Sequence, residues 1–251
     1  MGAVTRLFWD GEQRRLGPML RGHLLLFERR DPPDYPAQAG LRLLLIVLVL
    51  ELLIGPRMEG LDRIGLPLPP GALRILIMIG LTLVAARWLA GVRLSDVGVL
   101  APNRWRAAEV LYLVQIFVIA GVILFVLFGT RLAGHGPELW RALGMTVLTA
   151  LLWGVQQELV YRGLLQTELT RRFGAWTGAL AANLAFTFGP LHWNYLAGRN
   201  PTSAAIMLAA IFAIGLVFAF IYGRTRKVLL VGLMHGIGAV FPAVSALASA
   251  G

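Results

Sequence analysis

Cysteine is absent from the 251 residues of this chain, which excludes disulfide bonds, thiolate nucleophiles and thiolate metal ligands. Charge is scarce as well: aspartate, glutamate, lysine and arginine together make up 14% of the residues, and lysine occurs once, as Lys227. Hydrophobic residues make up 57% of the chain, and a soluble domain of ordinary composition is far less apolar. The composition therefore predicts a polytopic membrane protein whose chemistry depends on carboxylates, imidazoles and hydroxyls.

The formal net charge of +10 is carried almost wholly by arginine. In a membrane protein such an excess marks cytoplasmic loops that face anionic headgroups, so the expected partner is the lipid bilayer and not nucleic acid. Arginine in place of lysine also indicates a GC-rich bacterial genome, and hence the bacterial inner (cytoplasmic) membrane. Residues 1–38 alternate basic and acidic side chains around an apolar stretch too short to cross a bilayer. We interpret them as a cytoplasmic or interfacial amino-terminal segment.

Residues 39–251 are predicted to form a transmembrane domain, an all-α bundle of about seven spans, with six to eight compatible with the apolar runs. The basic loops fall on alternate sides of these spans, which places the amino terminus in the cytoplasm. The first span is short and contains two charged residues, Arg42 and Glu51. The predicted spans cover residues 40–55, 72–91, 107–128, 142–170, 176–197, 204–222 and 228–249.

Four ionisable side chains lie inside otherwise apolar stretches: Glu158, Arg162, His192 and His235. Burial of such a group at bilayer depth costs at least about 2.5 to 3.5 kcal/mol on insertion scales, so each one requires a partner or a function. A carboxylate, a guanidinium and two imidazoles are the groups of hydrolytic chemistry. Scattered polar contacts between helices are the alternative interpretation.

The fourth and fifth spans are predicted to form an antiparallel hairpin about Gly174. At a rise of about 1.5 Å per residue, Glu158 and His192 lie at about the same height, about 24 Å from this turn, so they can face each other. Arg162 follows Glu158 by four residues and shares its helix face, so it can hold the carboxylate. An internal salt bridge near the headgroups is the alternative for this pair. His235 is expected nearer the basic end of the last span, unless that helix begins earlier or is tilted.

Three short motifs occur in order on successive apolar helices. They read Gln157-Glu158-Leu-Val-Tyr-Arg162, Phe188-Gly-Pro-Leu-His192 and His235-Gly-Ile-Gly-Ala239. This pattern resembles the E-E-x-x-x-R, F-x-x-x-H and H-x-x-x-N motifs of the CPBP intramembrane proteases, a family of CAAX prenyl endopeptidases and bacteriocin-processing, Abi-like proteins. The resemblance covers about residues 142–245. It implies a hydrolase of the glutamic type that cleaves a peptide bond in a membrane-embedded protein or peptide.

The resemblance also assigns roles to individual residues. A carboxylate would take a proton from the attacking water, while His192 orients that water and His235 donates to the developing oxyanion. The implied catalytic positions are Gln157, Glu158, His192 and His235, with Arg162 and Phe188 in support.

Two departures from the family pattern affect the expected activity. Gln157 stands where the family has its first glutamate, and Ala239 stands where it has an asparagine. Glutamine cannot accept the proton, and alanine cannot donate to an oxyanion. Either Glu158 takes over as the base, or the chain is an inactive pseudoprotease that serves as a structural or assembly subunit of a membrane protein complex.

No cofactor is expected. Two histidines and a glutamate could supply the three protein ligands of a catalytic zinc ion. They come, however, from three separate helices without the H-E-x-x-H spacing, which favours the glutamic mechanism over a metal.

Overall fold

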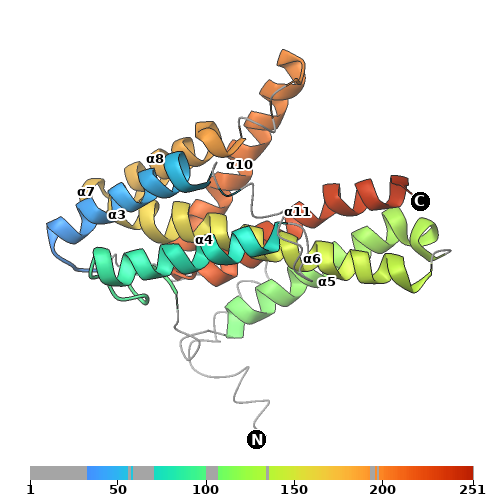
Figure 1. The fold of residues 1–251 in the computed structure, drawn as a ribbon, viewed down its shortest axis with the longest axis horizontal. Helices are drawn as coiled ribbons and strands as arrows, with labels where there is room; N and C mark the ends of the chain where they lie inside the picture. Colours follow the sequence, from blue (N-terminus) through green and yellow to red (C-terminus); the bar gives the residue numbers. More distant parts are fainter. Residues whose placement is uncertain are drawn as a thin grey trace, which may run out of the picture.

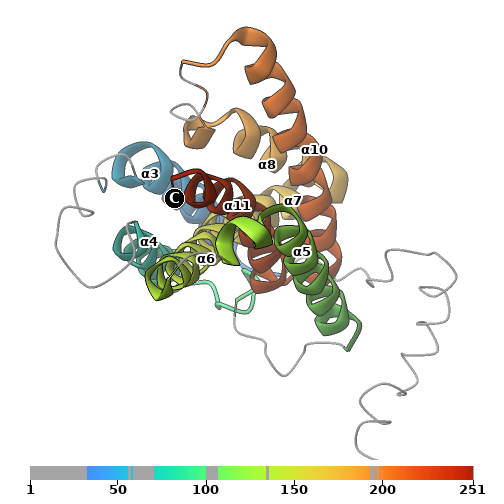
Figure 2. The same ribbon diagram turned by 90° about the vertical axis from the view of Figure 1, so that its right-hand side faces the viewer.

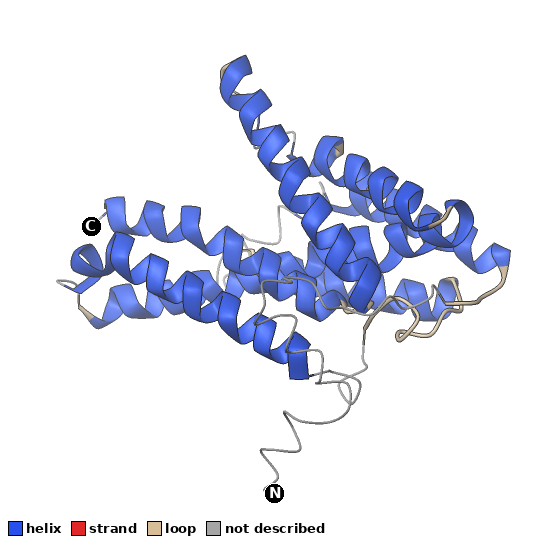
Figure 3. Cartoon of the chain, turned by 180° about the vertical axis from the view of Figure 1, so that it is seen from behind, coloured by secondary structure: helices blue, strands red, loops and turns tan. Residues whose placement is uncertain are grey.

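The computed structural model describes residues 33–55, 58, 71–99, 107–133, 136–192, 196 and 198–250, which are mostly helical (Figure 3). No strand occurs among these described residues, so the predicted all-α fold is confirmed. The interfacial segment predicted for residues 1–38 lies outside the described residues as far as position 32. In chain order the helices are α3 (Ala37–Val49), η2 (Leu50–Ile54), α4 (Ala72–Val84), η4 (Ala85–Leu89), α5 (Ala107–Ala133), α6 (Pro137–Glu158), η6 (Leu159–Gln166), α7 (Thr167–Phe173), α8 (Ala175–Phe188), η7 (Pro190–His192), α10 (Pro201–Thr225) and α11 (Val228–Ala250).

Within the described ranges, six helices are long and apolar enough to cross a membrane, by length and composition. The prediction of about seven spans is confirmed as an approximate number. Two of the candidate spans join an α-helix to a π-helical segment, and the longest unites α6, η6 and α7. The six cover Ala37–Ile54, Ala72–Leu89, Glu109–Thr130, Pro137–Phe173, Pro201–Thr225 and Val228–Ser245.

The fifth predicted span, residues 176–197, ends earlier than expected. Its helix, α8, stops at Phe188 after 14 residues, a length of about 21 Å against about 30 Å for the bilayer core. The backbone turns extended at Gly189 (φ −73°, ψ 175°), because the residue before a proline is disfavoured in the α conformation. The chain then forms the short 3₁₀ turn η7, which carries His192.

The centre of the bundle is the long helix formed by α6, η6 and α7, against which α4, α8, α11 and α3 pack. Figure 2 looks along this bundle and shows α4, α5 and α11 around α6, while α10 leans away. In Figure 1 the amino-terminal half of α10 projects beyond the other helices. As a whole, α10 packs more closely against α8 than against α11, which follows it in the chain.

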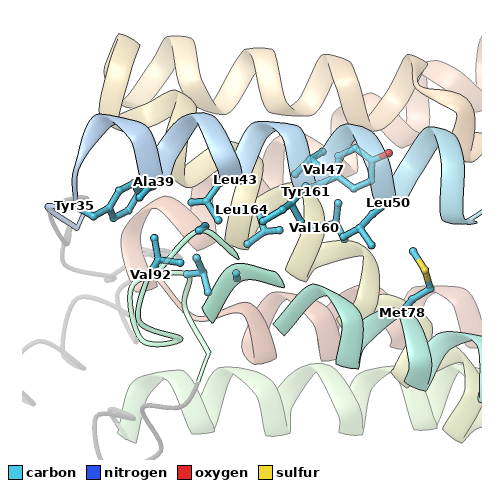
Figure 4. Packing of buried hydrophobic residues seen from close by; sticks show 14 of the residues in the cluster. Tyr35, Ala39, Leu43, Val47, Leu50, Met78, Val92, Val160, Tyr161 and Leu164 are labelled. Carbon is cyan, nitrogen blue, oxygen red and sulfur yellow. The ribbon is translucent and has the colours of Figure 1, made fainter. Parts of the chain in front are cut away.

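A buried apolar cluster fixes η6 against α3 and η2 (Figure 4). Leu43 and Leu50 from the first helix pack here with Val160 and Leu164 from η6, and all four side chains are at most 3% exposed. Lipid tails are as apolar as these side chains, so the gain comes from close packing more than from removal of water. The cluster holds the segment that carries Arg162 in a defined orientation.

Polar contacts tie the start of α3, the end of η4 and α7 together at one end of the bundle. The Tyr35 hydroxyl donates to Glu168 Oε2 (2.9 Å), and Arg171 and Arg172 also pair with Glu168. Burial, with Glu168 beside it, raises the pKa of the Tyr35 hydroxyl. Arg42 donates to the Leu89 carbonyl (3.1 Å). These contacts hold the first helix, η4 and α7 together at this end of the bundle.

The second charged residue of the first span, Glu51, also finds its partner on a neighbouring helix. Glu51 Oε2 accepts a hydrogen bond of 2.8 Å from the Tyr161 hydroxyl of η6. Arg42 and Glu51 thus both form hydrogen bonds to neighbouring helical segments. Glu51 is partly buried between helices, whereas Arg42 lies at the surface of the bundle.

Candidate active site

Glu158 occupies the junction of α6 and η6 and is 0% exposed. Its Oε2 accepts from Arg162 Nε–H (3.1 Å), and its Oε1 lies 2.8 Å from Nδ1 of His235 on α11. A carboxylate paired with a guanidinium only accepts hydrogen bonds, so Nδ1 of His235 is the donor. In the neutral tautomer that carries its proton on Nδ1, Nε2 of this imidazole keeps its lone pair.

Glycines allow α6 and α11 to approach closely enough for this contact. A Cβ atom at Gly154 would overlap the carbonyl oxygen of Gly232 and the backbone of Gly236. A Cβ atom at Gly236 would in turn lie 2.8 Å from the Ala150 carbonyl oxygen. Small residues at such crossings are typical of membrane helices. Glu158 lies one turn after Gly154 on α6, and His235 lies one turn after Gly232 on α11, so the crossing places these two side chains beside each other.

Arg162 connects the carboxylate to two further helices. Its Nη2 donates to Asn183 Oδ1 on α8 (3.0 Å) and to the Gly215 carbonyl on α10 (3.1 Å). Asn183 itself donates to the Phe212 carbonyl (2.9 Å). Arg162 is fully buried, so these contacts offset the cost of its charge in a medium of low dielectric constant. The result is a guanidinium held from three sides behind Glu158.

Besides the hydrogen bonds from Arg162 and Asn183, the main chain of α10 accepts a third side-chain hydrogen bond. Gln166 of η6 donates through Nε2 to the Ala219 carbonyl (2.8 Å). The acceptors at Phe212, Gly215 and Ala219 are spaced so that they lie along one face of α10. The hydrogen bonds that join α10 to η6 and α8 are therefore accepted by the backbone of α10.

Aromatic rings enclose the imidazole of His235. Phe218 stacks on it with ring centroids 5.3 Å apart and an interplanar angle of 25°. Trp153 and Phe186 meet it edge-on, at 5.5 Å and 5.7 Å. Three ring contacts and the bond from Nδ1 to Glu158 hold the orientation of His235.

His192 lies on η7, and its side chain contacts the same aromatic ring. Its Nδ1 is 3.0 Å from the Phe186 carbonyl oxygen, and its ring centroid is 5.1 Å from that of Phe186. A carbonyl only accepts, so Nδ1 carries the proton here as well. η7 lies outside the six candidate spans, and burial lowers the pKa of His192, which keeps the imidazole neutral at pH 7. The rings of His192 and His235 thus both contact Phe186.

A cavity of about 810 Å³ extends from these histidines between α4, α6, α10 and α11. Its walls are mainly apolar, and its polar lining consists of few side chains. Glu158 and Gln157 do not belong to this lining, whereas both histidines do. The side chains that line it include Arg74, Thr146, Thr149, Trp153, Phe186, His192, Ile211, Ile214, Phe218, His235 and Ala239.

The two residues that depart from the family pattern lie in different surroundings. Gln157 is 0% exposed, and neither its Oε1 nor its Nε2 has a hydrogen-bond partner in the part of the chain that the structure describes. Ala239 lines the cavity one turn after His235. Gln157 is therefore held away from the cavity, while Ala239 adjoins it.

Phe188, expected to support the site, is 54% exposed, whereas Phe186 is 3% exposed and contacts both histidines. Sequence patterns alone do not single out Phe186 or Trp153 as site residues. Phe186 and Phe188 both precede His192 in LAFTFGPLH, and the early end of α8 decides which ring faces the site. Among the described residues, no group of three or more histidine, aspartate or glutamate side chains could hold a metal ion.

Residues 138–241 match the family model of the Rce1-like type II CAAX prenyl endopeptidases. The matched region includes all three motifs, and the predicted resemblance to the CPBP intramembrane proteases is confirmed over this region. No curated protein and no solved structure matches the chain.

Proposed function

We propose that this protein is an intramembrane endopeptidase of the CPBP glutamic type, in which His235 and Glu158 together activate the attacking water. The observation that carries the proposal is the bond between His235 Nδ1 and Glu158 Oε1 (2.8 Å), with Arg162 behind the carboxylate and the imidazole on the cavity wall. Hydrogen-bonded relays of this kind are typical of hydrolytic nucleophile activation.

In the proposed reaction, water attacks the carbonyl carbon of a peptide bond and gives a proton to Nε2 of His235. Glu158 stabilises the resulting imidazolium through Nδ1, and neutral His192 accepts a hydrogen bond from the second O–H of the water and so orients it. The C–N bond of the tetrahedral intermediate then breaks, and the leaving amine takes the proton from Nε2. The second hydrogen of the water stays on the new carboxyl group, so the products are a carboxylic acid and an amine, and the relay returns to its starting state.

The substrate in this proposal is a membrane-embedded protein or peptide, because the cavity walls are mainly apolar. The reaction needs no cofactor. Sequence reasoning placed Glu158 itself as the base on water; its absence from the cavity lining favours a role through His235.

A second candidate function is supported by Gln157 and Ala239, which remove two polar groups of the family pattern. In this alternative the chain is an inactive CPBP-like pseudoprotease. It binds a membrane partner in the cavity and serves as a structural or assembly subunit of a complex.

The substitution Gln157→Glu separates the two functions. Purified protein in phosphatidylethanolamine and phosphatidylglycerol vesicles is assayed against a quenched-fluorescent peptide library, each member carrying an apolar segment of membrane-spanning length. If His235 and Glu158 form the relay, the parent cleaves library members. Gln157→Glu then changes the rate by less than the factor of about 10² that positioned proton transfer contributes.

The neighbouring substitution Gln156→Glu provides the control, since Gln156 is also buried on α6. If Gln157 marks a lost base, the parent cleaves nothing and Gln157→Glu creates cleavage. Absence of hydrolysis from both proteins, together with a stoichiometric membrane partner, would exclude the enzyme and support the subunit.

The proposed location is the bacterial inner membrane, with the amino terminus in the cytoplasm, because the basic segments gather on one side of the spans. Single cysteines replacing Arg172 and Arg226 should be shielded from an impermeant thiol reagent added outside intact cells, and one replacing Gly198 should react. The cysteine-free parent gives no background. Labelling at Arg226 with protection at Gly198 would invert the orientation.

A further inference from the structure

Trp153, whose side chain carries an indole N–H, lines the cavity beside His235. It lies on α6, and its ring meets the imidazole edge-on at 5.5 Å with an interplanar angle of 73°. Across the described residues, its N–H has no hydrogen-bond partner. The indole N–H only donates, so a group that enters the cavity with an acceptor oxygen would find this donor unoccupied.

The proposed reaction requires such a donor. Attack of water on the carbonyl carbon moves the π electrons of the C=O bond onto its oxygen, and preorganised donors at that oxygen are a major source of catalysis. His235 and His192 both carry their ring protons on Nδ1, which is already bound. Ala239, where the family pattern has an amide side chain, has no donor to offer.

Other polar groups of the cavity are less suited to this position. The Thr149 hydroxyl donates to the Met145 carbonyl (2.9 Å). Thr146 lies seven residues before Trp153 on α6, about 10 Å further from His235. Arg74 belongs to the first turn of α4, at another wall of the cavity. Trp153 is the donor in direct contact with the proposed base.

We propose that the indole N–H of Trp153 binds the carbonyl oxygen of the scissile peptide bond and stabilises the oxyanion that forms there, in place of the side-chain amide missing at Ala239. The inference rests on the proposed peptide hydrolysis. The indole donates a hydrogen bond and transfers no proton: when the C–N bond breaks, the electron pair returns from oxygen to the C=O bond. A rigid aromatic donor in an apolar cavity needs little reorganisation for this role.

The test removes the indole N–H of Trp153 on α6 and then supplies a side-chain amide donor at position 239 on α11. Trp153→Phe keeps a ring against His235 and removes the N–H, and should lower kcat for the vesicle-embedded peptide library by about 10²-fold or more with little change in KM. Adding Ala239→Asn should restore a large part of the loss, because the amide projects into the same cavity one turn from His235. A purely structural role for Trp153 gives no reason for such rescue.

Two controls separate the lost N–H from altered packing. Trp140→Phe makes the same change at an exposed position of α6 and should leave kcat unchanged. Site-specific replacement of Trp153 by 3-benzothienylalanine keeps the bicyclic shape without the N–H, and should reproduce the loss even if the phenylalanine variant folds poorly.

The outcomes distinguish this inference from the proposed function. If the parent cleaves the library and the benzothienylalanine protein is equally active, the role of Trp153 is wrong and the proposed function stands. Loss of activity in Trp153→Phe, with full activity of the benzothienylalanine protein, would assign Trp153 to packing. If the parent cleaves no member of the library, the proposed function fails, and the inference fails with it.

Discussion

Replacement of Glu158 by glutamine should lower kcat for peptide cleavage by about 10⁴-fold while the protein stays folded. In serine-hydrolase triads, exchange of the orienting carboxylate for its amide has about this effect, because the histidine is then held in the wrong tautomer. The same reasoning applies to His235, whose Nδ1 lies 2.8 Å from Glu158 Oε1. An amide NH₂ at this position would favour the proton on Nε2, and the imidazole could no longer accept one from water.

The measurement compares kcat of Glu158→Gln with that of Glu138→Gln, which makes the same change in the exposed first turn of α6. The amide oxygen at position 158 still accepts from Arg162, so thermal unfolding in detergent should remain cooperative. Full activity of Glu158→Gln would show that the relay plays no part in the reaction.

Replacement of Gly154 by alanine should destabilise the protein by about 3 kcal/mol or more, at the upper end of the range for overpacked positions. The new methyl group would overlap the backbone of α11 at Gly232 and Gly236, and backbone cannot move aside as a flexible side chain can. Separation of α6 from α11 would also break the bond between Glu158 and His235. Both the free energy of unfolding and the cleavage activity should therefore fall.

Gly144→Ala, on the same helix, is the matched control, because a Cβ atom there meets nothing within 4 Å. Alanine is the better helix former by roughly 1 kcal/mol, so this variant should be as stable as the parent or more stable. Unfolding in a mild detergent, followed by circular dichroism, compares the two. Equal stability of the two variants would mean that α6 and α11 do not cross as closely as described.

The class of protein could be predicted from the sequence. Composition and apolar run length indicated a helical membrane bundle, because bilayer thickness sets the length of an apolar helix. Counting residues from Gly174 predicted similar depths for Glu158 and His192 along one continuous helix, but α8 ends at Phe188 and His192 lies on the separate turn η7, so this count no longer applies. The match of residues 138–241 to a protease family covers the three sequence motifs.

The rotation and crossing of helices could not be obtained in this way. His235 was expected to lie nearer the basic end, yet it donates directly to Glu158 (2.8 Å), because glycines on α6 and α11 permit a close crossing that hydropathy does not encode. The aromatic contacts of His235 depend on how α6, α8, α10 and α11 are each rotated about their own axes. Partners of this kind follow from three-dimensional packing, and no spacing within one helix specifies them.

The attachment of α10 through its carbonyl groups has a consequence for sequence change. Its contacts with Arg162, Asn183 and Gln166 are accepted by main-chain oxygens, which every residue type supplies. Mutations can therefore accumulate along α10 without loss of the hydrogen bond from Arg162 to the carbonyl of residue 215, provided that the side chain at this position stays small. Ile211, Ile214 and Phe218 of the same helix line the cavity. New substrate preferences could evolve at these three positions while the buried charges remain in place.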